Sequence, residues 1–583
     1  MELNERLLLI QAALGQVPLD LLVRNVQVVN VHTGRIAPGA LGIKSGRIVS
    51  TAADNLPALE VVDGEGLYAA PGLIDTHVHI DSTLLVPESL AELIVPVGTT
   101  LLLADPMEIA NVAGAAGLKA LLAGAGKLPY HVRLEVPSRV PTAPGLETTG
   151  GILDLEAVRE ILAWPDTVSL GELDPSKVLG LREEYLEKVA AAQVLGKICN
   201  GHAAGLSGQD LNAYACGGLA DDHECVDARD ALERLALGLA VLVREGSSER
   251  NLEPILSSLL NEKVDFSQLM FCTDDKHPDD ILREGHINYM VRKAAALGVP
   301  PVEALRMATL NAARHFRIDH DFGSLAPGRW ADFLLVPDLA GMLPERVYVR
   351  GKLAAVEGRM VGEAANPNYP DWLNHTVRVT RGRAANDFRL EAAGQEAVVR
   401  VINLVPGQII NRAASATLRV EGGAVQPDPA QDILKLAVVE RYGKNGNIGL
   451  SFVRGFGLKK GAIASSVSHD HHNIVAAGTN DEDMAACVRE IEALQGGLVV
   501  AAGGRVLRSL PLPVGGLMSA RPAGEVITAL DALTEIFRSL GGTLPAPMMA
   551  LSFISLPTVP ELGLTDLGLV NVAGHHLISP FLD

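Results

Sequence analysis

The 583-residue sequence has few cysteines, little positive charge and no long apolar run, and each shortage excludes a class of protein. Its five cysteines are scattered and form no C-x-x-C pair, which excludes a disulfide framework and favours a reducing cytoplasm. The 49 Lys and Arg are outnumbered by 69 Asp and Glu, and a formal net charge of -20 disfavours binding to nucleic-acid phosphates. No apolar run reaches the ~20 residues that a membrane span requires. We therefore expect a cytoplasmic protein that binds neither nucleic acid nor membrane.

The length of the chain and its changes in composition predict several domains. An N-terminal helix and short strands with glycine turns occupy 1–70, and a repeated strand-then-helix pattern occupies 71–325. A sequence pattern typical of β-strands returns over 326–365, and we expect this segment to join 1–70 in one small β-sandwich domain. A polar segment, 366–383, is predicted to be a linker. The remaining residues, 384–583, are predicted to form a C-terminal α+β domain.

The middle segment is α/β in character, because apolar strand candidates alternate with amphipathic helix candidates. Eight such strands joined by crossovers predict a parallel (β/α)8 barrel of the TIM type. The strand candidates are 72–80, 99–106, 131–138, 167–174, 197–203, 218–224, 239–246 and 269–275.

The first strand of this barrel contains the stretch DTHVHI, with two histidines one residue apart. Because side chains alternate between the faces of a strand, Asp75, His77 and His79 point the same way. Functional side chains of such barrels gather at the C-terminal ends of the strands, where this pair lies. Taken alone, the pair is explained equally well as two polar strand residues that bind nothing.

Other predicted strands end in the same way, with a histidine or carboxylate just before a turn. Because five strand ends share this pattern, we predict that they converge on one metal site. Imidazole and carboxylate together suit Zn, Mn or Fe rather than a thiolate site. The candidate ligands are His77, His79, Glu172, His202, His223 and Asp274, with Asp275 beside the last.

These motifs resemble those of the amidohydrolase superfamily, and longer stretches resemble the adenine deaminase family. The resemblance covers the predicted barrel and also the C-terminal region, so it is more specific than the H-x-H pair. The stretches that carry it are 96–114, 200–224, 244–252, 272–294, 308–316 and 449–478.

The resemblance implies that the six candidate ligands hold two divalent ions, Mn or Fe, with Zn possible. Glu172 takes the bridging place between them. The implied reaction is the hydrolytic deamination of adenine to hypoxanthine and ammonia, a step of purine salvage, in a homo-oligomer. The sequence departs from the family pattern at Met107 and at 173–177. Both departures lie close to the predicted site, and they bear on which substrate is bound more than on metal binding.

Deamination needs an activated water and a group that moves its proton to the ring and to the leaving amine. Asp274 is the candidate for this shuttle, and His223, or His202, is the candidate for polarising the purine. With Glu172 as the bridging carboxylate, these residues form the predicted catalytic set. The other base-deaminase design uses a P-C-x-x-C motif around one zinc, and the sequence contains no such motif.

Four further residues are candidates for substrate binding. Glu147 lies in a loop after the third strand, and simple exposure is its alternative. Arg244 and Ser247 follow the seventh strand, where a helix cap is the alternative for the serine. His471 belongs to the cluster SHDHHN, 468–473, which predicts a loop over the barrel mouth, a second metal site or a solvated turn.

Two other functions remain open at this level. One is a cyclic-amide or N-acyl hydrolase of the same superfamily. Glu172, where a lysine is expected in dihydropyrimidinase-like enzymes, disfavours it. The other is a non-catalytic metal-binding barrel, which the intact ligand set disfavours.

Overall fold

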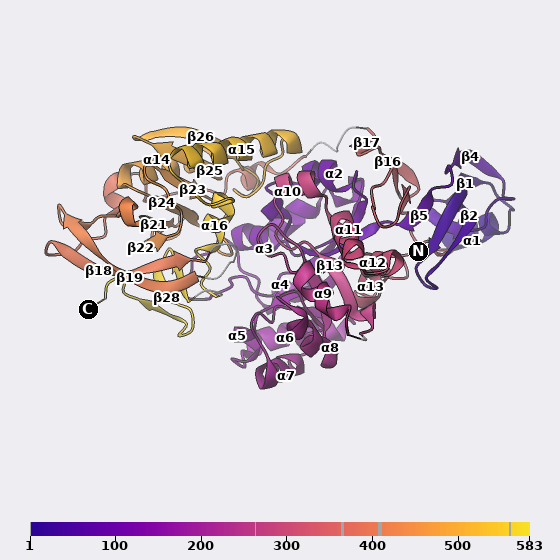
Figure 1. Ribbon diagram of the computed structural model, residues 1–583, viewed down its shortest axis with the longest axis horizontal. Helices are drawn as coiled ribbons and strands as arrows, with labels where there is room; N and C mark the ends of the chain where they lie inside the picture. The colour runs from indigo at the N-terminus through magenta and orange to yellow at the C-terminus, as the bar shows by residue number, and fades with distance from the viewer. Residues whose placement is uncertain (1, 263, 363–366, 406–410, 559–560, 583) are drawn as a thin grey trace.

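The computed structural model describes residues 2–262, 264–362, 367–405, 411–558 and 561–582. Figure 1 shows three parts along the long axis of the molecule: the N-terminal strands at one end, the strand-and-helix segment in the middle and the C-terminal domain at the other end.

The N-terminal part is a nine-stranded sheet built from two segments that are far apart in the sequence. Strand β14 pairs antiparallel with β5, in a register that places Phe333 opposite Pro71 and Val336 opposite Tyr68. The two segments that flank the middle part therefore meet in one sheet. Its elements are α1 (Leu3–Ala13), β1 (Leu19–Asn30), β2 (Arg35–Lys44), β3 (Arg47–Ser50), β4 (Ala58–Asp63), β5 (Tyr68–Pro71), β14 (Phe333–Val336), β15 (Arg346–Val349), β16 (Lys352–Val356) and β17 (Arg359–Met360).

All eight strands predicted for the middle segment are present, and each lies inside its predicted range. They form a five-stranded and a three-stranded sheet in which every pair is parallel. The strands are β6 (Leu73–Val78), β7 (Thr99–Ala104), β8 (His131–Val136), β9 (Thr167–Leu173), β10 (Ile198–Gly201), β11 (Asp221–Asp222), β12 (Ala240–Arg244) and β13 (Leu269–Cys272).

Hydrogen bonds join these two sheets at both of their edges. At one edge the Asp274 N–H donates to the His77 carbonyl at 3.0 Å, and the His79 N–H donates to the Asp274 carbonyl at 3.2 Å. At the other edge the Ala220 N–H donates to the Cys199 carbonyl at 2.9 Å. The first junction brings the end of β6 directly beside the residue that follows β13.

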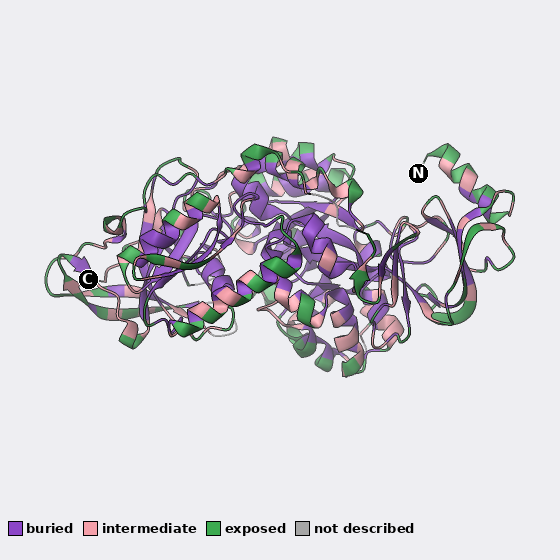
Figure 2. Ribbon diagram, turned by 90° about the horizontal axis from the view of Figure 1, so that it is seen from above, coloured by how far each residue is buried: buried purple, intermediate pink, exposed green. Residues whose placement is uncertain are grey.

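Helices follow most strands, as the crossovers of a parallel sheet require. They are α2 (Pro87–Ile94), α3 (Met107–Leu122), α4 (Leu155–Leu162), α5 (Pro175–Val178), α6 (Glu183–Val194), α7 (Gly208–Cys216), α8 (Ala228–Ala236), α9 (Leu252–Leu259), α10 (Pro278–Glu284), α11 (Ile287–Leu297), α12 (Pro301–Met307) and α13 (Leu310–His315). Figure 2 shows the interior of this part as buried and its outer helices as partly exposed.

One helical stretch among the described residues, Met107–Lys127, is long and apolar enough to cross a membrane by length and composition only. It contains α3, which follows β7 and buries the polar side chains of Glu108 and Asn111. A helix in the core of a soluble protein passes the same test, so the stretch is weak evidence for a membrane.

Over its described residues, the C-terminal domain has a nine-stranded sheet, a three-stranded sheet and three α-helices. Its helices are α14 (Asp481–Leu494), α15 (Ala523–Ser539) and α16 (Pro547–Phe553). Its strands are β18 (Glu396–Leu404), β19 (Asn411–Glu421), β20 (Ala424–Val425), β21 (Ile433–Val439), β22 (Ile448–Arg454), β23 (Ala462–Ser465), β24 (Ile474–Gly478), β25 (Gly497–Ala502), β26 (Arg505–Pro511), β27 (Leu562–Thr565), β28 (Gly568–Asn571) and β29 (His576–Ile578).

The segment predicted as a linker, 366–383, packs against this domain over its described residues, 367–383. Val377 and Val379 are buried in one of its apolar clusters, and the Arg378 N–H donates to the Arg441 carbonyl at 2.7 Å. The described part of this segment therefore lies on the surface of the C-terminal domain, with most of its residues exposed or half-buried.

The C-terminal domain also bonds to the middle segment. The Ser519 N–H donates to the Leu84 carbonyl at 2.8 Å, and the Thr148 N–H donates to Asp566 Oδ1 at 2.9 Å. The largest cluster of buried apolar side chains includes residues of both parts. The two parts therefore share one core, and the C-terminal domain lies over the loops that follow the parallel strands.

Candidate metal centre and substrate cavity

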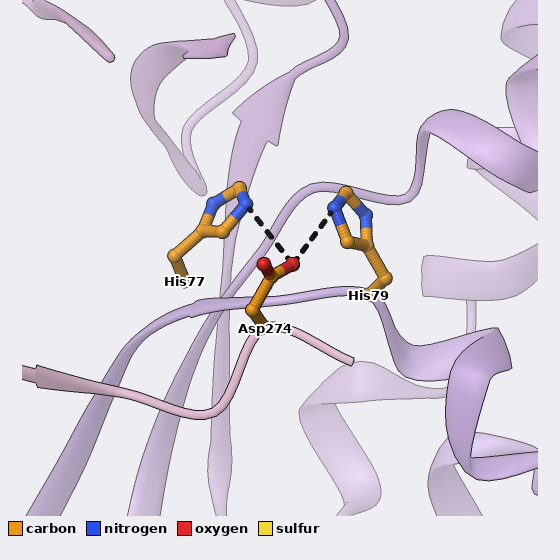
Figure 3. A group of neighbouring side chains, drawn as sticks. All are labelled: His77, His79 and Asp274. Atoms are coloured by element: carbon orange, nitrogen blue, oxygen red, sulfur yellow. Dashed lines mark ion pairs between the residues drawn. The ribbon is translucent and has the colours of Figure 1, made fainter. Parts of the chain in front are cut away.

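Two histidines of β6 and its end face an aspartate that follows β13 (Figure 3). His79 Nε2 lies 3.4 Å and His77 Nε2 lies 3.9 Å from Asp274 Oδ1. The hydrogen bonds between the backbones of these strand ends fix this arrangement. Because all three side chains are buried and converge on one point, they form a possible metal-binding group.

A second group lies beside the first and is centred on Glu172, at the end of β9. Its Oε2 lies 3.0 Å from His223 Nε2 and 2.9 Å from His202 Nδ1. The same oxygen lies 3.8 Å from His77 Nε2, which belongs to the first group. One carboxylate oxygen therefore faces three imidazoles and connects the two groups, so the structure brings all six predicted ligands together.

His202 and His223 follow the short strands β10 and β11, and a buried ion pair between Asp222 and Arg234 holds the ends of these strands. Asp222 Oδ2 accepts from Arg234 Nε at 2.8 Å, and its Oδ1 accepts the N–H groups of Ala203 at 2.9 Å and Glu224 at 3.0 Å. The two-residue strand β11 is thus supported by side-chain hydrogen bonds that a longer strand would not need.

The donor set fits a metal ion. His77 Nδ1 donates to Glu135 Oε2 at 2.6 Å, and His79 Nδ1 donates to the Asp105 carbonyl at 2.9 Å. Among the described residues, the buried His77 Nε2 has no hydrogen-bond partner. A histidine held through one nitrogen with the other left bare is the usual arrangement of a metal ligand.

The Glu135→Gln variant is expected to bind the metal about 10- to 100-fold more weakly, because the carboxylate that orients His77 and raises its basicity is lost. Competition for Mn(II) against a fluorescent chelator measures the affinity. Glu156→Gln, on the exposed side of α4, is the matched control. An unchanged affinity in Glu135→Gln would show that Glu135 does not support the ligand.

Two arginines hold the central carboxylates in their ionised form. Burial raises the pKa of Asp274, but Arg244, at 2.5 Å from Oδ2, and the nearby histidines lower it to about 2. Burial likewise acts against ionisation of Glu172, and the ion pair with Arg139 and the contacts with His202 and His223 bring its pKa well below the usual value. Both side chains are therefore anionic near neutral pH and available to a cation.

A small cavity of about 50 Å³ opens onto these groups. It is lined from the middle segment by His79, Met107, Glu108, Arg139, Glu172, His202, His223, Glu224, Arg244, Glu249, Asp274 and Asp275. It is lined from the C-terminal domain by His469, Asp470, Phe553, Leu556 and Thr558.

Of the four predicted substrate residues, Arg244 alone lines this cavity. Glu147 does not line the cavity. It is buried and accepts a hydrogen bond from the Ala143 N–H, so the alternative of simple exposure is wrong too. Ser247 donates to Asp280 Oδ2 at 2.5 Å rather than facing the cavity. His471 is buried behind its own loop, with Nδ1 accepting from the Asn473 N–H.

The sequence prediction missed several cavity residues. Glu224 directly follows His223, and Glu108 directly follows Met107, so position next to a motif was the available signal for both. His469 and Asp470 belong to the cluster SHDHHN, which indicated their loop but not which of its side chains reach the cavity. Arg139 carries no such signal, because it reaches the cavity from a loop placed by the tertiary fold.

Two family models match the chain. Residues 68–354 match the amidohydrolase family, and residues 408–576 match the adenine deaminase C-terminal domain.

Curated relatives are similar along almost the whole chain. An adenine deaminase from Desulforamulus reducens is 54% identical over 575 residues, which are 98% of this chain and 98% of that protein. An adenine deaminase 2 from Carboxydothermus hydrogenoformans is 42% identical over 567 residues, 97% of each chain. Among solved structures, a zinc-bound adenosine deaminase from Xanthomonas campestris is similar with a TM-score of 0.44 and 16% identity, covering 59% of this chain and 94% of that one.

Proposed function

The chain belongs to the adenine deaminase family of the amidohydrolases, and we propose that it hydrolyses adenine to hypoxanthine and ammonia at the candidate metal centre. The observation that carries the proposal is the convergence of two buried ligand groups on Glu172 at the floor of a cavity. The identity to adenine deaminases extends over both the barrel and the C-terminal domain, which supports the choice of substrate.

We propose that two divalent ions bind per chain, Mn or Fe, with Zn also accepted by these ligands. His77, His79 and Asp274 would hold one ion, His202 and His223 the other, and Glu172 would bridge them. When bound, such ions lower the pKa of a water and stabilise developing negative charge.

Asp274 is proposed to move the proton of the attacking water. Its Oδ2 is held by Arg244, so Oδ1 remains directed at His77 and His79 and toward the cavity. An ionised carboxylate so oriented accepts one proton from the attacking water and delivers it to N1 of the purine ring, and it then passes the second proton of that water to the leaving amine. Water supplies the new C6 oxygen, and the C6–N bond breaks to release ammonia. His223 lines the cavity and is proposed to contact the ring as well as to act as a ligand.

The proposal is tested by purifying the chain with Mn(II) supplied and following ammonia and hypoxanthine from adenine. A cyclic-amide hydrolase would instead open a hydantoin, and a non-catalytic barrel would bind metal without turnover. The expected result is equimolar ammonia and hypoxanthine with no hydantoin opening. Hydantoin or N-acyl hydrolysis without adenine turnover would overturn the assignment.

We further propose a cytoplasmic, homo-oligomeric enzyme. All five cysteines are free thiols, as a reducing compartment favours. Light scattering of the purified protein measures the oligomeric state.

A further inference from the structure

One wall of the substrate cavity comes from the C-terminal domain. His469 and Asp470 lie in the loop between β23 and β24, and Phe553 ends α16. The rings of His469 and Phe553 stack on each other, with centroids 4.9 Å apart and planes 14° apart. A flat aromatic pair therefore lines the cavity together with the candidate metal ligands, and this pair is called the aromatic wall below.

The aromatic wall is held in place by hydrogen bonds on several sides. The His469 N–H donates to the Ser552 carbonyl at 3.0 Å, which ties the loop to α16. Ser468 Oγ lies 2.5 Å from Ser555 Oγ, and Asn473 Nδ2 donates to the Thr148 carbonyl of the middle segment at 2.8 Å. A flat surface fixed in advance binds a flat ligand at little entropic cost.

Carboxylates with spare acceptor capacity surround this wall. His469 Nδ1 lies 3.5 Å from Glu108 Oε1, and His469 Nε2 lies 3.9 Å from Asp275 Oδ1. Among the described residues, both oxygens of Glu108, Asp275 Oδ1 and Asp470 Oδ2 are buried without a hydrogen-bond partner. Buried acceptors of this kind need donors, and a ligand with N–H groups provides them.

Glu108, His469 and His472 also lie close enough together to hold a third metal ion. The hydrogen bonding argues against that use. The Ser468 N–H donates to His472 Nδ1 at 3.1 Å, so in the neutral imidazole the proton resides on Nε2. A protonated Nε2 cannot ligate a metal. Glu108 and His469 therefore remain available to contact the substrate.

We propose, on the premise that the chain deaminates adenine, that the C-terminal domain supplies the substrate-stacking surface of the active site. The purine ring extends the stack of His469 and Phe553, and its N–H groups face Glu108, Asp275 and Asp470. Every purine has a π-face and adenine has N–H donors, so this surface matches the base in shape and in hydrogen-bonding character.

The test compares His469→Gln and Phe553→Leu with the parent enzyme, using His576→Gln, an exposed histidine of the same domain, as the control. Both variants keep a side chain of similar size and remove one ring of the stack. Steady-state kinetics with adenine, metal content and equilibrium dialysis of hypoxanthine are measured on each. We expect KM for adenine and the dissociation constant for hypoxanthine to rise about 5- to 100-fold, because the stacking energy is lost. The parent's metal content is retained.

Unchanged KM and hypoxanthine binding in both variants would overturn the role of the aromatic wall while leaving the deaminase assignment intact. Loss of metal from either variant would also overturn it, because His469 or Phe553 would then support the metal centre. A parent enzyme that does not turn over adenine would defeat the proposed function itself. The dialysis experiment needs no turnover, so it reports on the wall even if a variant is slow.

Discussion

The Asp274→Asn variant is expected to deaminate adenine about 10²- to 10⁴-fold more slowly than the parent, the range found when a positioned acid–base group is removed. The amide has nearly the same shape as the carboxylate but cannot accept a proton from water. Since Arg244 holds Oδ2 and the two histidines face Oδ1, the substitution removes the proton acceptor at the site where the reaction needs one.

Initial rates of hypoxanthine formation measure this effect, and the metal content of the same preparation is measured beside them. Asp279→Asn is the matched control, because Asp279 lies nearby at the start of α10 and pairs with Arg283 instead of the ligands. Full activity of Asp274→Asn with metal bound would contradict the shuttle role.

The Glu172→Gln variant is expected to lose both its metal and its activity. One oxygen of Glu172 faces three imidazoles, so the neutral amide removes the negative charge that joins the two ligand groups. It also leaves the buried Arg139 without its nearest counter-charge. Breaking a buried ion pair in this way costs about 3–5 kcal/mol of unfolding free energy.

Metal analysis after dialysis and urea unfolding of the metal-free protein separate the two effects. Glu184→Gln, whose side chain is exposed beside Arg182, serves as the control for a charge change alone. A variant that keeps the parent's metal content would show that Glu172 does not bridge the ions.

The clustering of the candidate ligands could be predicted from the sequence because their signal is local. An apolar strand that ends in a histidine or carboxylate is visible within a few residues, and parallel strands deliver such ends to one edge. This holds for His77, His79 and Glu172, and the structure brings these residues together.

The remainder of the cavity depends on the tertiary fold. His469 and Phe553 lie 84 positions apart in the sequence. They meet because α16 packs beside the loop that follows β23. His471, which the sequence singled out, is turned into the domain by a hydrogen bond within its own loop. A dense histidine cluster therefore indicates the right loop but not which ring reaches the substrate.

The segment 366–383 shows a second limit of sequence reasoning. Its polar composition predicts a linker, and within its described residues Val377 and Val379 are buried in an apolar cluster of the C-terminal domain. A few apolar side chains at the correct spacing decide the docking of a short segment, whatever its mean composition.

Titration of the metal-free enzyme with Mn(II), with hypoxanthine formation and bound metal followed together, shows whether adenine turnover depends on the candidate metal centre. We expect turnover of adenine to rise with bound metal and to stop rising at about two ions per chain, as in other two-metal hydrolytic sites. Deamination of adenine by the metal-free protein would contradict it, and so would full activity after His77 and His79 have both been replaced by alanine.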